Sequence, residues 1–242
     1  MTIKTALVVG GTSGIGLGIV ENLLHRGIKV YCIGRREFKN KNTFSDTLNF
    51  IQADLTVPGA LNCIQNELKN VNLDYIIFSV ATETPLKIFS EITEAEYDYA
   101  FSLNVKIPFL LTKMLLNNLN LHARILFLTS RLSATPESGS LIYCMSKSAL
   151  ETFSTGLNKE FTGKIFASSI IPGVVDTEMQ KRLREADPRV FPHTHTYQAM
   201  YPKLRSVKVV SEAITTHLCD TNNIDFAQQK VNLFENKSIA NE

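Results

Sequence analysis

The sequence has little net charge and no long hydrophobic run. Its 25 basic residues nearly balance 23 acidic ones, which leaves a net charge of +2. The densest basic stretch, residues 181–189, also carries Glu185 and Asp187, and this mixture is typical of a solvated helix face. No stretch approaches the roughly 18 consecutive apolar residues that indicate a membrane-spanning helix. We therefore expect neither nucleic acid nor a membrane among the partners.

Cysteine is scarce, and its spacing matches no metal or redox motif. The four cysteines, Cys32, Cys63, Cys144 and Cys219, are scattered and form no C-x-x-C pair. In a chain of 242 residues this is typical of free thiols in a reducing compartment. The first residues also lack the charged leader and apolar core of a signal peptide, so the expected location is the cytoplasm.

Strand and helix patterns alternate along the whole chain. No repeat, low-complexity stretch or linker interrupts them, although the polar residues 39–46 are expected as a loop. This order predicts an α/β fold, a Rossmann-type doubly wound parallel sheet in a single domain spanning residues 1–242. The expected strands are 3–9, 29–33, 48–53, 73–80, 124–129, 164–171 and 230–234.

A glycine-rich segment lies between the first strand and its helix. Glycine lets the backbone approach a pyrophosphate closely, and the start of the helix offers free N–H groups and the positive end of its dipole. Glycines alone would indicate only a tight turn, but strand, glycine turn and helix together predict a dinucleotide-binding loop. The residues expected to contact the cofactor there are Gly10, Thr12, Ser13, Gly14, Ile15 and Gly16.

Two arginines follow the second strand. In dinucleotide folds an acidic residue near this position binds the ribose 2′-hydroxyl, whereas an arginine accommodates a 2′-phosphate. Arg35 and Arg36 therefore favour NADP(H) over NAD(H). Asp54 and Leu55 follow the third strand, at the same edge of the sheet. Asp54 can contact the adenine amino group, or it can cap the next helix.

A tyrosine and a lysine four residues apart form the centre of the candidate site. Tyr143 and Lys147 lie one turn apart on the same helix face, and a nearby ammonium favours the ionised phenol. Ser130 ends the fifth strand and can hold a substrate oxygen beside the phenol. This set can pass a proton to a carbonyl or from an alcohol. The Tyr-x-x-x-Lys spacing by itself also occurs by chance.

Two further segments are expected near the site. Thr93 and Glu96 form a capping box, and the helix that they begin runs toward Asn104, where Pro108 should kink or restart it. An asparagine at such a break can leave its amide and the local backbone free to bind water. Residues 178–206 are polar, basic and interrupted by proline, which favours a mobile loop over the site.

Two histidines in the sequence Thr-His-Thr-His-Thr raise the question of a metal site. Histidine is the commonest metal ligand in proteins. No cysteine or carboxylate cluster accompanies His193 and His195 in the sequence. We therefore expect a solvated or substrate-facing loop there, and no metal ion.

Taken together, these residues make the chain resemble the short-chain dehydrogenase/reductase family over nearly its whole length. The resemblance depends on the order and spacing of several motifs that are weak one by one. They are Gly10-x-x-x-Gly14-x-Gly16, Asp54, Asn104, Ser130, Tyr143-x-x-x-Lys147 and Pro172-Gly173.

The resemblance implies a role for each of these residues. Tyr143 would be the general acid in reduction and the base in oxidation, and Ser130 would hydrogen-bond the substrate carbonyl. Lys147 would bind the nicotinamide ribose and lower the pKa of Tyr143, and Asn104 would hold a water in the proton relay. Hydride would come from the nicotinamide, and Thr177 would help to place its carboxamide. Further cofactor contacts are implied for Val80, Pro172, Gly173 and Val175.

The chain departs from the family pattern in several places, and the segment after the fourth strand is the one nearest the expected cofactor site. Where the family has Asn-Asn-Ala-Gly after its fourth strand, this chain has Phe78–Ala81. That segment normally supports the sheet and the adenosine side of the cofactor. The family is commonly dimeric or tetrameric, so a homodimer or homotetramer built with the helices of Asn104 and Tyr143 is expected.

Residues 172–180 are similar to the sepiapterin reductase and benzil reductase branch, whose members reduce carbonyls, often vicinal diketones, with NADPH. The leading hypothesis is therefore NADPH-dependent reduction of a small ketone or vicinal diketone to an alcohol. One alternative is a 3-oxoacyl-thioester reductase, with the basic segment 181–208 meeting an acidic carrier protein. The alternative from another class is a non-catalytic NADP(H)-sensing protein, although proteins of that kind often lose the tyrosine or the lysine.

Overall fold

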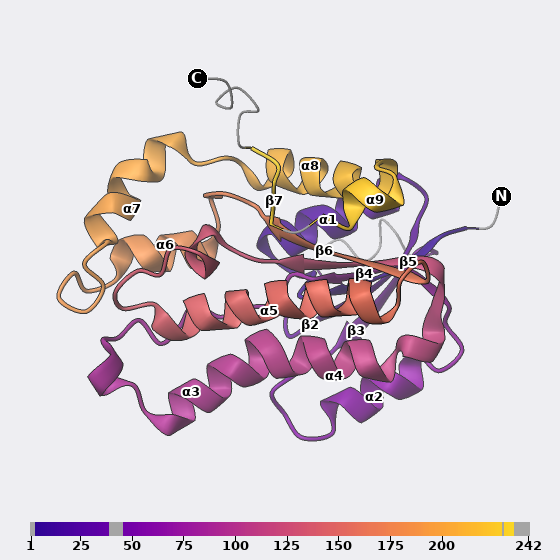
Figure 1. Cartoon of the computed structure of the whole chain (residues 1–242), viewed down its shortest axis with the longest axis horizontal. Helices are drawn as coiled ribbons and strands as arrows, with labels where there is room; N and C mark the ends of the chain where they lie inside the picture. The colour runs from indigo at the N-terminus through magenta and orange to yellow at the C-terminus, as the bar shows by residue number, and fades with distance from the viewer. Residues whose placement is uncertain (1–2, 39–45, 229, 235–242) are drawn as a thin grey trace.

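Seven parallel strands form one sheet at the centre of the molecule (Figure 1). The computed structural model describes residues 3–38, 46–228 and 230–234, and the loop expected at 39–46 lies outside the described residues except for its last position. The strand order is β3-β2-β1-β4-β5-β6-β7, and every neighbouring pair is parallel. The predicted doubly wound sheet is therefore confirmed. The strands are β1 (Thr5–Val9), β2 (Lys29–Gly34), β3 (Leu48–Gln52), β4 (Leu73–Phe78), β5 (Leu119–Leu128), β6 (Ile165–Ile171) and β7 (Val231–Asn232).

Helices cover both faces of the sheet. Successive strand residues point to opposite sides, and apolar residues at successive positions therefore make both faces apolar. In β1, Ala6 and Val8 belong to one apolar cluster with α1, α8 and α9, whereas Leu7 and Val9 belong to another with α2, α4 and α5. Burial on both faces explains why the strands are apolar at successive positions. The helices are α1 (Gly14–His25), α2 (Ala60–Glu67), α3 (Glu94–Phe101), α4 (Ile107–Met114), α5 (Leu141–Glu160), α8 (Val207–Asp220) and α9 (Asn223–Phe226).

Between α3 and α4 the chain makes a π-helical turn at Ser102–Lys106. Thr93 begins α3 with the predicted capping box, in which the Glu96 carboxylate accepts a hydrogen bond from Thr93 N at 2.9 Å. Pro108 lies in the first turn of α4, so the predicted restart is confirmed. Proline has no N–H for the carbonyl four residues earlier, which is that of Asn104. The regular α-helical ladder cannot continue through this point, and the turn widens there.

Residues 178–206 contain two α-helices and a short 3-10 helix at Tyr201–Lys203, which corrects the expectation of a loop. The first begins at Thr177, whose hydroxyl accepts a hydrogen bond from Gln180 N at 3.3 Å. The second packs through aromatic residues, since the ring of the fully buried Phe191 lies 5.5 Å from that of Tyr197. The apolar residues of this segment are too few to give a helical pattern in the sequence. The helices are α6 (Glu178–Glu185) and α7 (Thr194–Met200).

The two histidines of this segment contact neighbouring side chains within it. The ring of His193 lies 5.9 Å from that of Phe191, and His195 Nδ1 is 3.3 Å from Gln198 Oε1. Among the described residues, no three His, Cys, Asp or Glu side chains gather as a metal site would require. Within the same ranges, no helix combines the length and the apolar character needed to cross a membrane.

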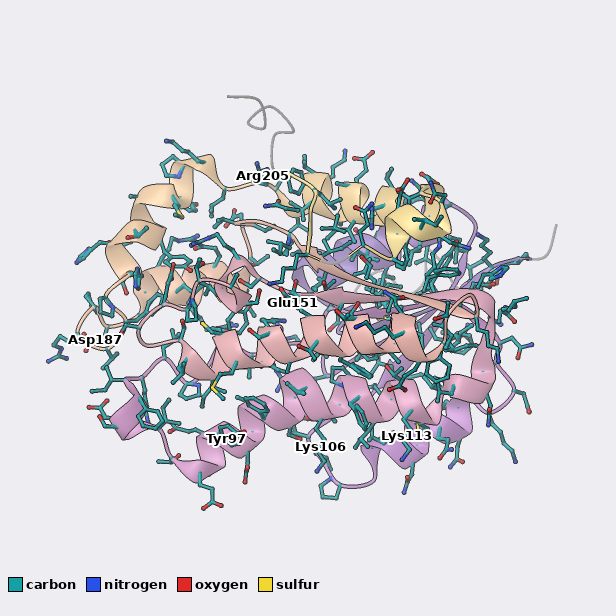
Figure 2. The ribbon with its side chains drawn as sticks, viewed as in Figure 1. Tyr97, Lys106, Lys113, Glu151, Asp187 and Arg205 are labelled. Carbon is teal, nitrogen blue, oxygen red and sulfur yellow. The ribbon has the colours of Figure 1, made fainter. Side chains whose placement is uncertain are left out.

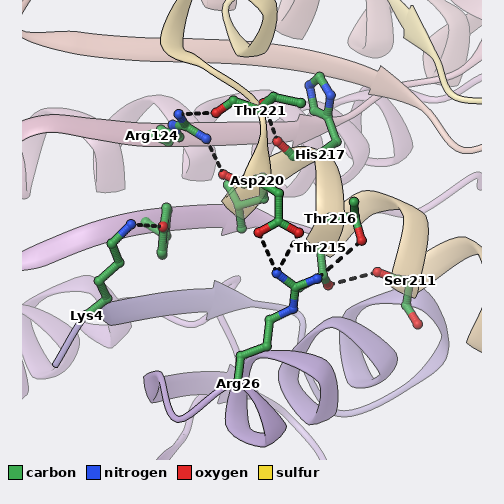
Figure 3. Close-up of polar contacts among 11 residues, drawn as sticks. Lys4, Arg26, Arg124, Ser211, Thr215, Thr216, His217, Asp220 and Thr221 are labelled. Atoms are coloured by element: carbon green, nitrogen blue, oxygen red, sulfur yellow. Dashed lines mark hydrogen bonds and ion pairs between the residues drawn. The ribbon is translucent and has the colours of Figure 1, made fainter.

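A buried arginine ties the C-terminal helices to the sheet (Figure 3). Arg124 of β5 is only 9% exposed, and it donates to the carbonyls of Leu218 at 2.6 Å and Thr221 at 2.7 Å. Carbonyls at the end of a helix have no partner within it, so the guanidinium supplies the missing donors for α8. Arg26, the C-cap residue of α1, pairs with Asp220 of α8 at 2.8 Å. Together these contacts fix α1, α8 and β5, the strand that leads to the candidate site.

Candidate active site

Ser130, Tyr143 and Lys147 come together where β5 ends and α5 begins. Lys147 Nζ donates to the carbonyl of Leu128, the last residue of β5, at 2.8 Å. The same nitrogen lies 5.3 Å from the centre of the Tyr143 ring. The side chain of Ser130 lies close enough to the Tyr143 phenol to act on its pKa. Three of the four predicted catalytic residues therefore form one cluster.

Burial decides the protonation state of this cluster. Lys147 is 2% exposed, and loss of hydration lowers its pKa to about 8. Burial raises the pKa of the Tyr143 phenol above its ordinary value, the side chain of Ser130 opposes this, and the Glu83 carboxylate adds to it. The pKa of Tyr143 is thus higher than normal, not lowered by Lys147 as expected. The reason is that the phenol loses hydration, while the ammonium lies over its ring.

Asn104 is fully buried, and its side-chain amide is bound to protein groups. Nδ2 donates to the carbonyl of Thr82 at 2.8 Å and to Ser146 Oγ at 3.0 Å, and Oδ1 accepts from Thr82 N at 2.8 Å. The amide is therefore not free to hold a water, which corrects the expectation for this side chain. The Asn104 amide joins the segment after β4, through Thr82, to α5, through Ser146. A water-binding role would fall to the backbone carbonyl of Asn104, to which Pro108 offers no N–H.

A cavity of about 430 Å³ opens beside the cluster, a volume typical of ligand sites. Most of the predicted cofactor residues line it, and they come from the carboxyl ends of several strands. The lining includes Gly10, Thr12, Ser13, Gly14, Ile15, Arg35, Arg36, Leu55, Val80, Tyr143, Lys147, Pro172 and Thr177. The predicted site residues outside the lining are Gly16, Asp54, Asn104, Ser130, Gly173 and Val175.

The glycine-rich turn forms a cradle that side chains would fill. Gly10 has a φ of +86°, and a Cβ there would lie 2.7 Å from Val80 N. A Cβ on Gly16 would lie 2.2 Å from the carbonyl oxygen of Gly10, so Gly16 serves the close packing of α1 against the turn. Ser13 and Ile15, at the start of α1, remain at the cavity wall. These residues fit a dinucleotide whose pyrophosphate lies at the start of α1.

The departure at Phe78–Ala81 changes how this edge of the sheet is supported. Phe78 is 2% exposed and stacks on Phe127 with ring centres 5.2 Å apart. Phe78 is thus a buried aromatic residue at a position where the family pattern has asparagine. Ser79 and Val80 still reach the cavity, so the departure leaves its wall intact.

Both predicted phosphate-binding arginines line the cavity beyond the end of β2. The Arg35 side chain is 60% exposed, and its Nη1 lies 3.9 Å from Asp54 Oδ2. Asp54 Oδ1 accepts hydrogen bonds from Thr56 Oγ1 at 2.7 Å and Thr56 N at 3.0 Å, which hold the pKa of Asp54 below its usual range. Asp54 therefore stabilises the turn after β3. Arg35 and Arg36 remain available to an anionic group in the cavity.

Several lining residues are not anticipated from the sequence, among them Thr82, Tyr99, Met179 and Arg182. Thr82 and Tyr99 come from the segment after β4 and from α3, and Met179 and Arg182 come from α6. Met179 and Arg182 are three residues apart, which places them on one face of a helix. That spacing is the signal that would have found them, had α6 been expected.

Comparison with known proteins agrees with this geometry. A family model described as short chain dehydrogenase matches residues 4–188. This chain belongs to the short-chain dehydrogenase family. The resemblance drawn from the motifs is therefore confirmed, and the glycine turn, Ser130, Tyr143 and Lys147 all lie within the matched range.

Several relatives of this short-chain dehydrogenase are reductases. An (S)-benzoin-forming benzil reductase of Bacillus cereus is 26% identical over 231 residues, which cover 87% of this chain and 92% of that protein. A hydroxynaphthalene reductase-like protein of Metarhizium robertsii is 31% identical over 192 residues, 74% of this chain and 71% of that protein. A benzil reductase of Saccharomyces cerevisiae is 29% identical over 199 residues, 75% of each protein. The two benzil reductases agree with the branch suggested by residues 172–180.

Solved structures of the family share the fold. A short-chain dehydrogenase/reductase of Saccharomyces cerevisiae superimposes with a TM-score of 0.87 at 23% identity, covering 96% of this chain and 97% of the other. A carbonyl reductase of Pseudomonas aeruginosa in complex with NADP has a TM-score of 0.76 at 20% identity, with the same coverage. The arrangement of sheet and helices is thus that of other short-chain dehydrogenases.

Replacing Lys147 by Met should stabilise the cofactor-free protein near neutral pH. The folded pKa of about 8 lies below the ordinary 10.5, so folding at neutral pH buries a charge that the unfolded chain exposes. The free energy of unfolding of the wild type should therefore rise as the pH increases from about 8, the pKa of Lys147 in the folded protein, to 10.5, its pKa in the unfolded chain. We expect the free energy of unfolding of Lys147→Met to exceed that of the wild type by about 1–3 kcal/mol at about pH 7. At about pH 10 the two proteins should differ little.

Urea unfolding at the two pH values measures this difference. Lys159→Met is the control, because Lys159 is an exposed lysine on the same helix and its removal should cause no such pH-dependent gain. A Lys147→Met variant that is less stable than the wild type near neutral pH would show that the hydrogen bond to Leu128 outweighs the desolvation of the ammonium.

Proposed function

We propose that this chain is an NADPH-dependent carbonyl reductase that converts a ketone or vicinal diketone into an alcohol. The observation that carries the proposal is the cluster of Ser130, Tyr143 and Lys147 at a cavity that also reaches the glycine-rich turn. Proton-transfer groups and a pyrophosphate cradle in one cavity can hold a carbonyl beside a nicotinamide. The benzil reductases among the relatives support a vicinal diketone as the substrate class.

The side chains suit the direction of reduction. Because its pKa is raised, the Tyr143 phenol stays protonated at neutral pH and can donate a proton to the carbonyl oxygen. Ser130 would donate a second hydrogen bond to that oxygen, and Lys147 would hold the ribose hydroxyls. NADPH, when bound, supplies the hydride and leaves as NADP⁺. The carbonyl carbon gains the hydride, the oxygen gains the phenolic proton, and the product is an alcohol.

Lys147 can also restore the proton that Tyr143 gives away. Its pKa of about 8 lies closer to neutral than that of an ordinary lysine, so the ammonium is a better acid. The ammonium lies over the phenol ring and can return a proton to the phenolate. The backbone carbonyl of Asn104, in the π-helical turn, is the place where a water would connect Lys147 to the solvent.

The choice of NADPH rests on charge. Arg35 and Arg36 line the cavity next to the turn where an adenosine ribose would lie, and Asp54 is held by Thr56. A guanidinium accommodates a 2′-phosphate, whereas an acidic residue at this place would favour the 2′-hydroxyl. The structural relative from Pseudomonas aeruginosa is itself an NADP complex.

We also propose that α3, α4 and α5 form the contact between copies of the chain in a homodimer or homotetramer. Tyr97, Tyr99, Phe109 and Met145, on these helices, are each 39–47% exposed. Figure 2 shows Tyr97 along the same side of the molecule as Lys106 and Lys113, which are both exposed. A groove between the helices has an apolar part lined by Tyr99, Phe101, Val105, Phe109, Ala149 and Phe153, and its polar lining residues are Thr56, Asp98, Ser102, Lys106 and Thr152. Exposed aromatic residues grouped with polar ones are typical of protein interfaces.

A carbonyl panel with a Tyr143→Phe control tests the proposed function. The panel holds a vicinal diketone, a pterin ketone, a 3-oxoacyl thioester and a simple aldehyde, and loss of NADPH absorbance is measured. We expect the diketone or the pterin to be reduced. In Tyr143→Phe, kcat should fall at least about 100-fold, because the proton donor is gone, while NADPH binding is unchanged. Thioester turnover alone would favour the thioester reductase, and tight NADPH binding without turnover would favour the sensing protein.

Arg35→Ala should separate the two cofactors. The substitution removes a guanidinium that would contact the 2′-phosphate of NADPH and has no counterpart in NADH. We expect the Kd for NADPH to rise at least about 10-fold and that for NADH to change less than about threefold. Tryptophan is absent from the chain, so the binding is best followed by calorimetry. Equal weakening of both cofactors would remove Arg35 from this role.

The assembly is tested by placing a charge on the proposed contact. Light scattering after gel filtration should give a dimer or tetramer for the wild type and a smaller species for Phe109→Glu, because a carboxylate would be buried without a partner. Leu121→Glu is the control, since Leu121 is 71% exposed at the start of β5, outside these helices. A monomeric wild type, or an unchanged mass in Phe109→Glu, contradicts the proposal.

A further inference from the structure

A buried carboxylate holds an arginine at the wall of the cavity. Glu83 follows β4 and is only 2% exposed, whereas the Arg182 side chain on α6 is 50% exposed. Arg182 donates from Nε to Glu83 Oε1, and from Nη2 to Glu83 Oε2 at 3.2 Å. A buried carboxylate is stable only with a partner, and the two-point contact fixes the plane of the guanidinium. The pair therefore orients Arg182 as well as neutralising Glu83.

Arg182 has hydrogen-bond donors left over. A guanidinium carries more N–H groups than the two that Glu83 accepts. Within the part of the chain that the structure describes, Arg182 has no other hydrogen-bond acceptor. The residue lines the same cavity as Tyr143 and Met179. Its remaining donors are therefore available to a molecule bound in this cavity.

We infer that Arg182 is a specificity-determining residue that donates a hydrogen bond to a second oxygen of the substrate, next to the carbonyl that is reduced. The inference rests on the proposed carbonyl reduction and deepens it. One oxygen would meet Tyr143 and Ser130, and the other would meet Arg182. Vicinal diketones and related compounds with two neighbouring oxygens are the class that fits.

The charge of the Glu83–Arg182 pair narrows the class of substrates. Glu83 balances the positive charge of Arg182, so the pair offers N–H donors with little net charge. A free arginine would attract a carboxylate, but a neutralised one suits the uncharged oxygen of a ketone. The contact also raises the pKa of Arg182, so the guanidinium keeps all its donors at neutral pH.

The test compares two substrates that differ in one oxygen. Benzil and deoxybenzoin share two phenyl rings and a ketone, but only benzil has the second carbonyl. In Arg182→Met we expect kcat/KM for benzil to fall about 10- to 100-fold, and that for deoxybenzoin to change less than about threefold. Arg182→Lys keeps one charged donor and should recover part of the loss. Binding of both compounds to the NADP⁺ complex is measured in parallel by calorimetry.

Two controls isolate the effect. Arg189→Met removes an arginine of the same segment that is 89% exposed and pairs with Asp187, and it should alter neither substrate. Thermal unfolding and the Kd for NADPH show whether Arg182→Met still folds and binds the cofactor. If Arg182→Met fails to fold, the comparison is made with Arg182→Lys. In that variant kcat/KM for benzil must still fall more than kcat/KM for deoxybenzoin.

The outcomes separate this inference from the proposed function. Equal loss for both substrates, or a weakened Kd for NADPH that accounts for the loss, overturns the role of Arg182 while carbonyl reduction stands. If the wild type reduces neither compound, the proposed substrate class fails. The binding measurement then still tests whether Arg182 contacts the second oxygen. Benzil bound more tightly than deoxybenzoin only when Arg182 is present supports the inference. Equal binding of the two compounds overturns it.

Discussion

One buried ammonium group determines the geometry of the candidate site. Lys147 Nζ donates to the carbonyl of Leu128, and this contact joins α5 to the end of β5. Tyr143 precedes Lys147 by one helical turn, and Ser130 follows Leu128 by two residues, so a single hydrogen bond places both side chains. Loss of hydration of the ammonium opposes folding, and groups with pKa values perturbed in this way gather at functional sites.

The second constraint is the side-chain amide of Asn104, whose observed role is structural. Its hydrogen bonds to Thr82 and Ser146 connect the segment after β4 with α5 across a π-helical turn. Thr82 lines the cavity, so the amide fixes one wall while Lys147 fixes another. The residue is therefore required whether or not a water binds to its backbone. This explains why a catalytic role and a structural role are difficult to separate at this position.

The parts of the fold that could be predicted have local signals. Gly10, in the turn before α1, and Gly16, in the first turn of α1, are glycines because backbone atoms approach their Cα atoms closely. Tyr143 and Lys147 are spaced by one helical turn. The partners of Asn104 have no such signal, since Ser146 is 42 residues away. The pKa of Tyr143 could not be predicted either. The sequence shows a lysine nearby, but it does not show how strongly the surrounding chain excludes water.

The segment from 178 to 206 shows why composition is a weak guide to a substrate pocket. Its arginines alternate with acids, which is typical of a solvated surface, yet Arg182 pairs with Glu83 at a distance of 99 residues in the sequence. A buried carboxylate requires a partner, and the requirement holds α6 over the cavity. On the proposed function, the motifs shared by the family would supply the cofactor site and the proton donor. The oxygen atoms that a substrate must carry would depend instead on a charge pair outside those motifs, so relatives with the same motifs could differ in the carbonyl compounds that they accept.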